Sequence, residues 1–137
     1  MKNESPEDAI RRAVDHFNTR RDRGACMDLY HPDCILHGFP HTENGREAIL
    51  GYFELVWGAF PDVELKIGDL VWDSERLVMR YGIVGTHAGI FMGISPTGKR
   101  VRLTGMMMMR FDNGRCSECW NEVNFLALLQ QTGIIPA

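Results

Sequence analysis

The sequence of 137 residues lacks a long hydrophobic run, an excess of positive charge and the short motifs of the large enzyme classes. No apolar stretch reaches the ~20 residues that a membrane-spanning helix needs, and residues 1–8 are polar, unlike the start of a signal peptide. The formal net charge of -3 leaves no surplus of Lys and Arg for phosphates or anionic lipids. Nucleic-acid and membrane partners are therefore not expected, and the expected compartment is the cytoplasm.

The cysteine content is also well below that of a disulfide-scaffold protein. The four cysteines, Cys26, Cys34, Cys116 and Cys119, would permit two disulfides, but a chain of this length can bury a core without them. Cys116 and Cys119 form a C-x-x-C pair, yet no second pair follows at the spacing of a zinc site. We expect reduced thiols, no metal site and no cofactor.

The content of 45% hydrophobic and 24% charged residues is typical of a globular protein. No linker or repeat interrupts it, so residues 1–137 are predicted to form one domain. Apolar residues at helical spacing predict helices over residues 6–19, 25–30 and 45–60, the first capped by Ser5 and the last stopped by Pro61.

After residue 62 the pattern changes to the alternation of strands. Strands are predicted from residue 63, over 77–84, over 100–111 and from 115, with a turn at Asp112-Asn113-Gly114 before the last. Helices followed by a strand meander indicate an α+β fold, in which helices pack on one face of a curved antiparallel sheet. A sheet that wraps over helices leaves a hydrophobic pocket.

Few ionisable side chains could enter such a pocket, namely His37, Arg80, His87, Glu118 and Glu122, with the amides Asn121 and Asn124 nearby. On the last strand Glu118, Trp120 and Glu122 share one face, while Ser117, Cys119 and Asn121 share the other, so only one set can line the pocket. A carboxylate beside Trp120 in an apolar cavity would have a raised pKa and could transfer protons near neutral pH. The alternative is an ion pair between Glu118 and a neighbouring cation such as Arg80.

Six side chains are candidate substrate contacts: Trp57, Phe60, Arg80, His87, Met107 and Trp120. The alternatives are core packing for Trp57 and Phe60, and a hydrogen bond to a turn for His87. His37 is either an acid or base in the pocket or a surface residue. Residues 106–109 are four methionines that alternate between the faces of a strand, two inward and two outward.

Residues 85–98, GTHAGIFMGISPTG, resemble the G-T-H-x-G-x-F-x-G-x-x-P-T-G segment of the SnoaL-like polyketide cyclases, also called ester cyclases. Residues 60–62 (FPD), 112–115 (DNGR), 118–120 (E-x-W) and 128–133 (LLQQTG) agree with the same family. The resemblance implies the cone-shaped α+β fold of the nuclear transport factor 2 superfamily.

The resemblance also implies ring closure of a polyketide ester by an intramolecular aldol condensation, without cofactor or metal, with an aspartate as acid and base. That aspartate falls at Asn121 in this sequence, its assisting histidine at Met107, and an aspartate common in the wider family at Asn124. None of these three residues can accept a proton at neutral pH.

Three hypotheses follow. The first is a cofactor-independent cyclase-like enzyme acting on a hydrophobic carbonyl compound, with Glu118 or His37 as the replacement base and Asn121 in the catalytic group. The second is a non-catalytic small-molecule-binding module on the same fold. The third is an epoxide hydrolase or isomerase like other members of the superfamily. By analogy we expect a homodimer formed through the exposed sheet face, where two of the methionines at residues 106–109 would lie.

Overall fold

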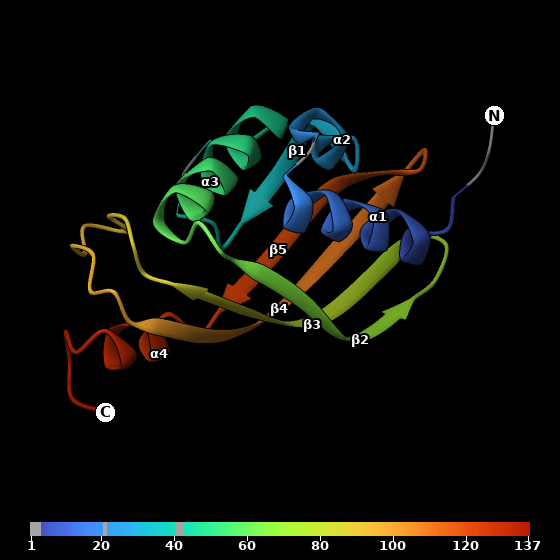
Figure 1. The fold of residues 1–137 in the computed structure, drawn as a ribbon. Coiled ribbons are helices and arrows are strands. Elements are labelled where there is room, and N and C mark those ends of the chain that lie inside the picture. The colour runs from blue at the N-terminus through green and yellow to red at the C-terminus, as the bar shows by residue number, and fades with distance from the viewer. Residues whose placement is uncertain (1–3, 21, 41–42) are drawn as a thin grey trace.

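The computed structural model describes residues 4–20, 22–40 and 43–137 (Figure 1). In chain order the elements are α1 (Pro6–Thr19), α2 (Arg23–Met27), β1 (Tyr30–His37), α3 (Arg46–Ala59), β2 (Glu64–Trp72), β3 (Arg76–Thr86), β4 (Arg100–Asp112), β5 (Arg115–Val123) and α4 (Phe125–Gln131). The predicted α+β class is confirmed, since helices α1, α2 and α3 all cover the same face of one sheet.

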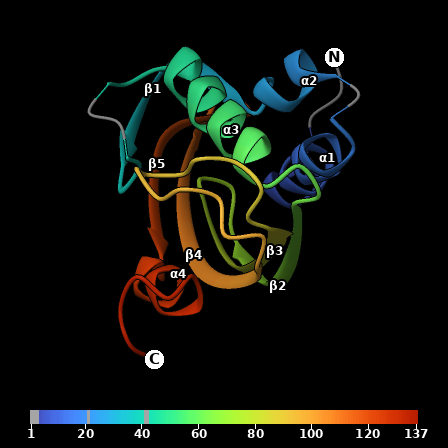
Figure 2. The same ribbon diagram turned by 60° about the vertical axis from the view of Figure 1, so that its left-hand side comes forward.

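The five strands are ordered β1-β5-β4-β3-β2, and the sheet curves beneath the helices (Figure 2). Strands β2 to β5 form the predicted antiparallel meander. Strand β1 pairs parallel with β5, so the sheet is mixed and not wholly antiparallel as predicted. Alternation of apolar residues reveals a strand but not its direction, and the long chain segment between β1 and β5 allows the crossover that a parallel pair needs.

The predicted first and third helices are confirmed almost to the residue. The Ser5 side chain accepts a hydrogen bond from the Asp8 amide at 3.1 Å and caps α1. Helix α3 ends at Ala59, with Phe60 as its C-cap and Pro61 beyond it.

The second helix is shorter than predicted, because Tyr30 already belongs to β1. Pro32 is tolerated in this strand, since β1 lies at the sheet edge and Pro32 falls between Tyr30 and Ile35, where the pairing with β5 is irregular. Helix α4 was not predicted, and Asn124 proves to be its N-cap, accepting a hydrogen bond from the Ala127 amide at 3.2 Å.

The segment between β3 and β4 closes one end of the fold, beside the C-terminus of α3 (Figure 2). The amides of Ala88 and Gly89 donate to the Ala59 carbonyl at 2.9 and 3.0 Å, and the His87 amide donates to the Lys99 carbonyl at 2.9 Å. Within the described parts of the chain, no helix has the length and apolar character needed to span a bilayer.

Candidate functional site

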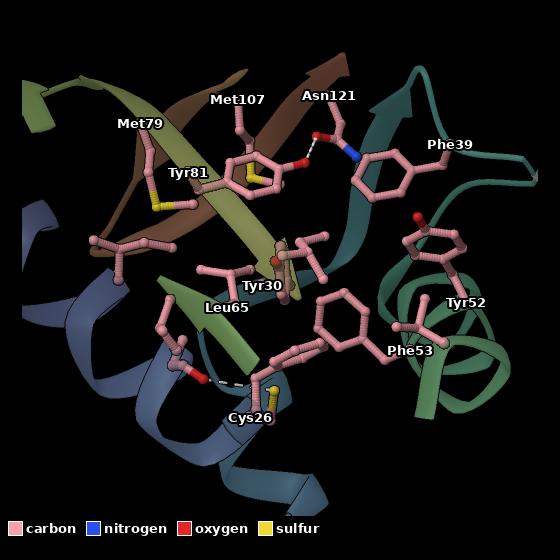
Figure 3. A pocket seen from close by; sticks show the side chains of 16 residues that line it. Cys26, Tyr30, Phe39, Tyr52, Phe53, Leu65, Met79, Tyr81, Met107 and Asn121 are labelled. Carbon is pink, nitrogen blue, oxygen red and sulfur yellow. Dashed lines mark hydrogen bonds between the residues drawn. The ribbon is translucent and has the colours of Figure 1, made fainter. Parts of the chain in front are cut away.

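A pocket lies between the helices and the inner face of the sheet, the face that the helices cover (Figure 3). The centres of water-sized molecules can occupy about 60 Å³ of it, which is room for roughly four to six waters. Its walls are almost entirely apolar or aromatic, and they comprise Ile10, Ala13, Val14, Phe17, Cys26, Tyr30, Phe39, Tyr52, Phe53, Val56, Leu65, Met79, Tyr81, Ile83, Met107 and Asn121.

Two polar side chains on the sheet side of the pocket are bonded to each other. The Tyr81 hydroxyl donates to Oδ1 of Asn121 at 2.6 Å, and both residues are buried. Tyr81 projects from β3 and Asn121 from β5, on either side of β4, where Gly105 is the partner of Tyr81 and Met107 is the partner of Asn121 (Figure 3). This hydrogen bond fixes which end of the Asn121 amide is available to a ligand.

The available end is the amide nitrogen. Nδ2 of Asn121 points away from Tyr81 and toward the Phe39 ring (Figure 3). An amide whose oxygen accepts a hydrogen bond is polarised, which strengthens its N–H groups as donors. Asn121 therefore offers donors at one point of an otherwise apolar wall, which suits a carbonyl oxygen.

Two glycines permit this arrangement. A Cβ atom at Gly105 would lie 2.5 Å from the Tyr81 ring, so a glycine is needed for the phenol to cross β4 toward Asn121. Gly38, with φ of +78°, approaches the Asn121 backbone so closely that a Cβ there would collide with its carbonyl oxygen. The two glycines let neighbouring strands approach Tyr81 and Asn121 without a side chain between them.

The ionisable groups that line the pocket are held in their neutral forms at physiological pH. Burial raises the pKa of the Tyr52 hydroxyl to about 12 and that of the Cys26 thiol to about 12. Burial also raises the pKa of Tyr81, and it raises that of Tyr30 well above its ordinary value. Among the described lining residues there is no carboxylate, histidine, lysine or arginine. Within this set the pocket offers hydrogen-bond donors and acceptors but no group that titrates near pH 7.

Glu118 and His37 lie on the outer face of the sheet, opposite the helices, and do not line the pocket. The register of β5 decides this, since Cys119 and Asn121 are buried on the inner face and Glu118 and Trp120 alternate with them. Nε2 of His37 is 2.8 Å from Glu118 Oε2, and Arg110 donates to Glu118 Oε1 at 3.2 Å. The expectation that Glu118 would line the pocket is therefore corrected.

A cluster of contacting side chains lies on the outer face and consists of Glu118, His37, Arg110 and Trp120. The His37 and Trp120 rings stack with centroids 5.1 Å apart, and the Arg110 guanidinium lies 5.6 Å from the Trp120 centroid. The alternative of an ion pair between Glu118 and a cation of the neighbouring strand is confirmed, but the cation is Arg110 of β4 and not Arg80. Arg80 instead bonds Asp69 at 2.6 Å, also on the outer face.

The other predicted substrate contacts lie partly in the pocket, partly in the core and partly at an adjoining cavity. Met107 and Asn121 line the pocket as the alternation allowed. Trp57 is buried in the core, where its Nε1 donates to the Phe17 carbonyl at 3.2 Å. His87 is fully buried and bonds Thr97 Oγ1 at 3.0 Å, which is the turn contact considered for it, and Phe60 lines a smaller adjoining cavity.

Sequence reasoning did not select Tyr81, Tyr52 or Phe39 as site residues. The signal for Tyr81 was present, because it lies in an alternating row with Leu77, Met79 and Ile83, and a tyrosine in such an apolar row requires a hydrogen-bond partner. No comparable signal marked Phe39, which follows β1 and reaches the pocket through tertiary packing against Tyr52 at 5.5 Å between ring centroids.

No metal centre is present among the residues that the structure describes, since no three His, Cys, Asp or Glu side chains are arranged to hold one. The four cysteines are all free and buried. The sulfurs of Cys34 and Cys116 are 3.9 Å apart, and hydrogen bonding between these thiols together with burial raises the pKa of Cys34.

Comparisons with solved structures agree on one fold. AclR, a proposed hydroxylase from Streptomyces galilaeus, is 27% identical with a TM-score of 0.83, over 96% of this chain and 82% of that chain. IdmH, a proposed polyketide cyclase from Streptomyces antibioticus, is 29% identical with a TM-score of 0.80, over 95% and 99%. A SnoaL-like protein from Jannaschia, 19% identical, shares the fold with a TM-score of 0.82 over 99% and 100%.

A comparison with curated protein sequences finds no match. The family model described as SnoaL-like polyketide cyclase matches residues 8–132, nearly the whole chain. That span includes every strand, the Tyr81–Asn121 pair and the segment at residues 85–98. The chain therefore belongs to the SnoaL-like polyketide cyclase family.

Proposed function

We propose that this protein is a cofactor-independent, cyclase-like enzyme that closes a ring in a hydrophobic carbonyl compound, such as a polyketide ester. The observation that carries the proposal is the Tyr81–Asn121 hydrogen bond on the wall of an apolar pocket in a chain of this family. The substrate carbonyl oxygen would accept a hydrogen bond from Nδ2 of Asn121, and the apolar walls would hold the remaining chain folded. IdmH, described as a proposed polyketide cyclase, supports this substrate class.

Ring closure in this pocket does not require a protein base. In an aldol reaction of an enolised β-dicarbonyl compound, the enol carbon attacks a second carbonyl carbon and forms the new C–C bond. The enol O–H becomes a carbonyl, and its proton passes to the alkoxide oxygen that the attack creates. The protein contributes a folded substrate conformation and a donor at the oxygen where negative charge develops.

This mechanism differs from the hypothesis that Glu118 or His37 replaces the missing aspartate. Both side chains project from the outer face, on the other side of the sheet from Asn121. A role for either as the base would require a substrate bound on that outer face.

The test is incubation with a linear β-keto ester that carries a second ketone in a 1,5 relation to the first, so that the carbon between ester and ketone can close a six-membered ring on it. The aldol product has the same mass as the substrate, so it must be resolved by NMR or chromatography. We expect ring closure with the parent protein and its loss with Asn121→Leu. Glu122→Gln is the matched control, since Glu122 is the next residue of β5 and is exposed. Equal activity of Asn121→Leu and the parent would contradict the proposal.

A second candidate is a binding module without chemistry. The observation that favours it is the presence of Asn121 and Met107 at positions where the resemblance implies an aspartate and a histidine, with no titratable replacement among the lining residues described. Tight binding without any product after prolonged incubation would establish this function. Epoxide hydrolysis or isomerisation by the paired aspartates of other superfamily members gains no support, because the described lining has no carboxylate.

A homodimer through the outer face of the sheet also remains our proposal. An apolar row crosses four strands there, made of Val71, Val78, Met108 and Trp120, and Met106 beside it is 53% exposed. Such a row would be covered by the same face of a second copy. Sedimentation should show a dimer that Met106→Lys weakens, whereas a purely monomeric parent would contradict it. The cytoplasmic location stays a prediction.

A further inference from the structure

A second, smaller cavity adjoins the pocket, and Val123, the next inward-facing residue of β5 after Asn121, lines it. The two share three lining residues, Tyr52 and Val56 of α3 and Ile83 of β3. The centres of water-sized molecules can occupy about 30 Å³ of the second cavity, which is room for about two waters or two methylene groups. The two spaces are therefore neighbouring compartments under the same helix.

The walls of the second cavity differ in chemistry from those of the first. Apart from the shared Tyr52, no polar side chain of the described residues lines it. Its far end is aromatic, with Phe91 5.4 Å from Phe60 and 6.5 Å from Phe125 between ring centroids. A cavity with such walls offers too few polar partners to hold water and favours an apolar group.

The position of the Asn121 amide relative to the second cavity indicates what that cavity could bind. Asn121 lines only the first compartment, and Phe91 and Phe125 line only the second. An apolar substituent of a ligand anchored at Asn121 can therefore extend past Tyr52 and Val56 into a further apolar space. The segment that carries Phe91 is tied to the end of α3 by the Ala88 and Gly89 hydrogen bonds to Ala59.

We propose that the second cavity is a subsite for an alkyl arm of the ligand, and that it sets the length of arm the protein accepts. The inference rests on the proposed function, because it takes the carbonyl to be held at Asn121. It adds the class of substrate: a carbonyl compound with an unbranched apolar arm, long enough to reach Phe91 and Phe125. Longer arms are excluded by the aromatic end wall.

The test uses straight-chain methyl ketones of increasing length, with affinity measured by calorimetry on the full-length protein. Burial of one methylene group strengthens binding by about fourfold. We expect this gain at each added carbon until the arm fills the second cavity, and no further gain beyond that length. The break in the plot of log Kd against chain length marks the end wall.

Two variants move that break in opposite directions. Phe125→Ala opens the end wall, so affinity should continue to rise for about two or three further carbons. Val101→Phe fills the cavity and should bring the break to shorter ketones, with the shortest ketones bound as by the parent. Leu126→Ala is the matched control, since Leu126 is the next residue of α4 and is 57% exposed.

The outcomes separate this inference from the function on which it rests. One outcome would overturn the subsite and leave the carbonyl site intact. In it, short ketones bind, and the break in the plot of log Kd falls at the same chain length in the parent, Phe125→Ala and Val101→Phe. Failure of Val101→Phe to fold leaves Phe125→Ala as the deciding variant. Absence of binding by every ketone would overturn both the carbonyl site and the subsite.

Discussion

Replacement of Tyr81 by phenylalanine would remove one hydroxyl group while keeping the ring in place. The lost hydrogen bond is the one to Asn121 Oδ1, at 2.6 Å between side chains that are only 4% and 3% exposed. An acceptor left buried without a partner costs about 1–3 kcal/mol. Since the pocket beside Asn121 has room for water, we expect the lower part of that range, about 1–2 kcal/mol.

A double-mutant cycle separates this bond from other effects. Asn121→Leu leaves the Tyr81 hydroxyl without its acceptor, and the double variant removes both partners, which is often nearly neutral. We therefore expect the sum of the two single losses of stability to exceed the loss in the double variant by about 2–3 kcal/mol. The assay is urea unfolding followed by tryptophan fluorescence, with unchanged dependence on urea as the check for two-state behaviour.

The result that would refute this reasoning is additivity. A coupling below about 0.3 kcal/mol would mean that the two side chains contribute independently. Asn121 would then not be oriented by Tyr81, and the amide nitrogen would not be fixed toward the pocket. Both the proposed carbonyl donor and its polarisation would lose their basis.

Three other predictions test neighbouring features. Gly105→Ala should destabilise the protein by about 1–3 kcal/mol in the same urea assay, because the new methyl group would overlap the Tyr81 ring. Gly82→Ala is the control and should not destabilise it, since its Cβ would come no closer than 3.8 Å to its neighbours. Burial in the folded state raises the pKa of Cys26 from 9.0 to about 12. The stability that the neutral thiol contributes is therefore complete below pH 9 and is lost as the pH rises toward 12. Cys26→Ala should lessen the fall in the free energy of unfolding between pH 9 and pH 12. Glu118→Gln should leave ketone affinity in calorimetry unchanged within about twofold, since its side chain faces away from the pocket, and a larger loss would place the ligand site on the outer face.

The fold could be predicted in most of its elements because the local signals were strong. Ser5 and Pro61 act within one or two turns of their own positions, and the change from helical spacing to alternation at residue 62 is a property of neighbouring residues. The parallel pairing of β1 could not be predicted in this way. It depends on where the chain returns after α3 and three strands, which no local pattern encodes.

The site was harder to predict than the fold. Alternation divided β5 into two sets, but only the packing of β5 against the helices shows that Asn121 and not Glu118 faces the pocket. Pairing of Tyr81 with Asn121 needs two strands that are separated in the sheet by β4. It also needs a glycine at position 105, where the Tyr81 ring crosses β4, and this need can be recognised only when the neighbours of Gly105 in space are known.

The sequence by itself determined the class of fold, the order of the elements and the resemblance to one family, because helix caps, turns and periodicity act over a few residues. The tertiary structure alone decided which residues meet. Asn121, Tyr81 and Phe39 line the same pocket, whereas Glu118 and His37 lie on the opposite face of the sheet. A second apolar cavity adjoins that pocket. The physical reason is that a pocket is formed by side chains distant in the chain, and their direction is set by strand register and packing together.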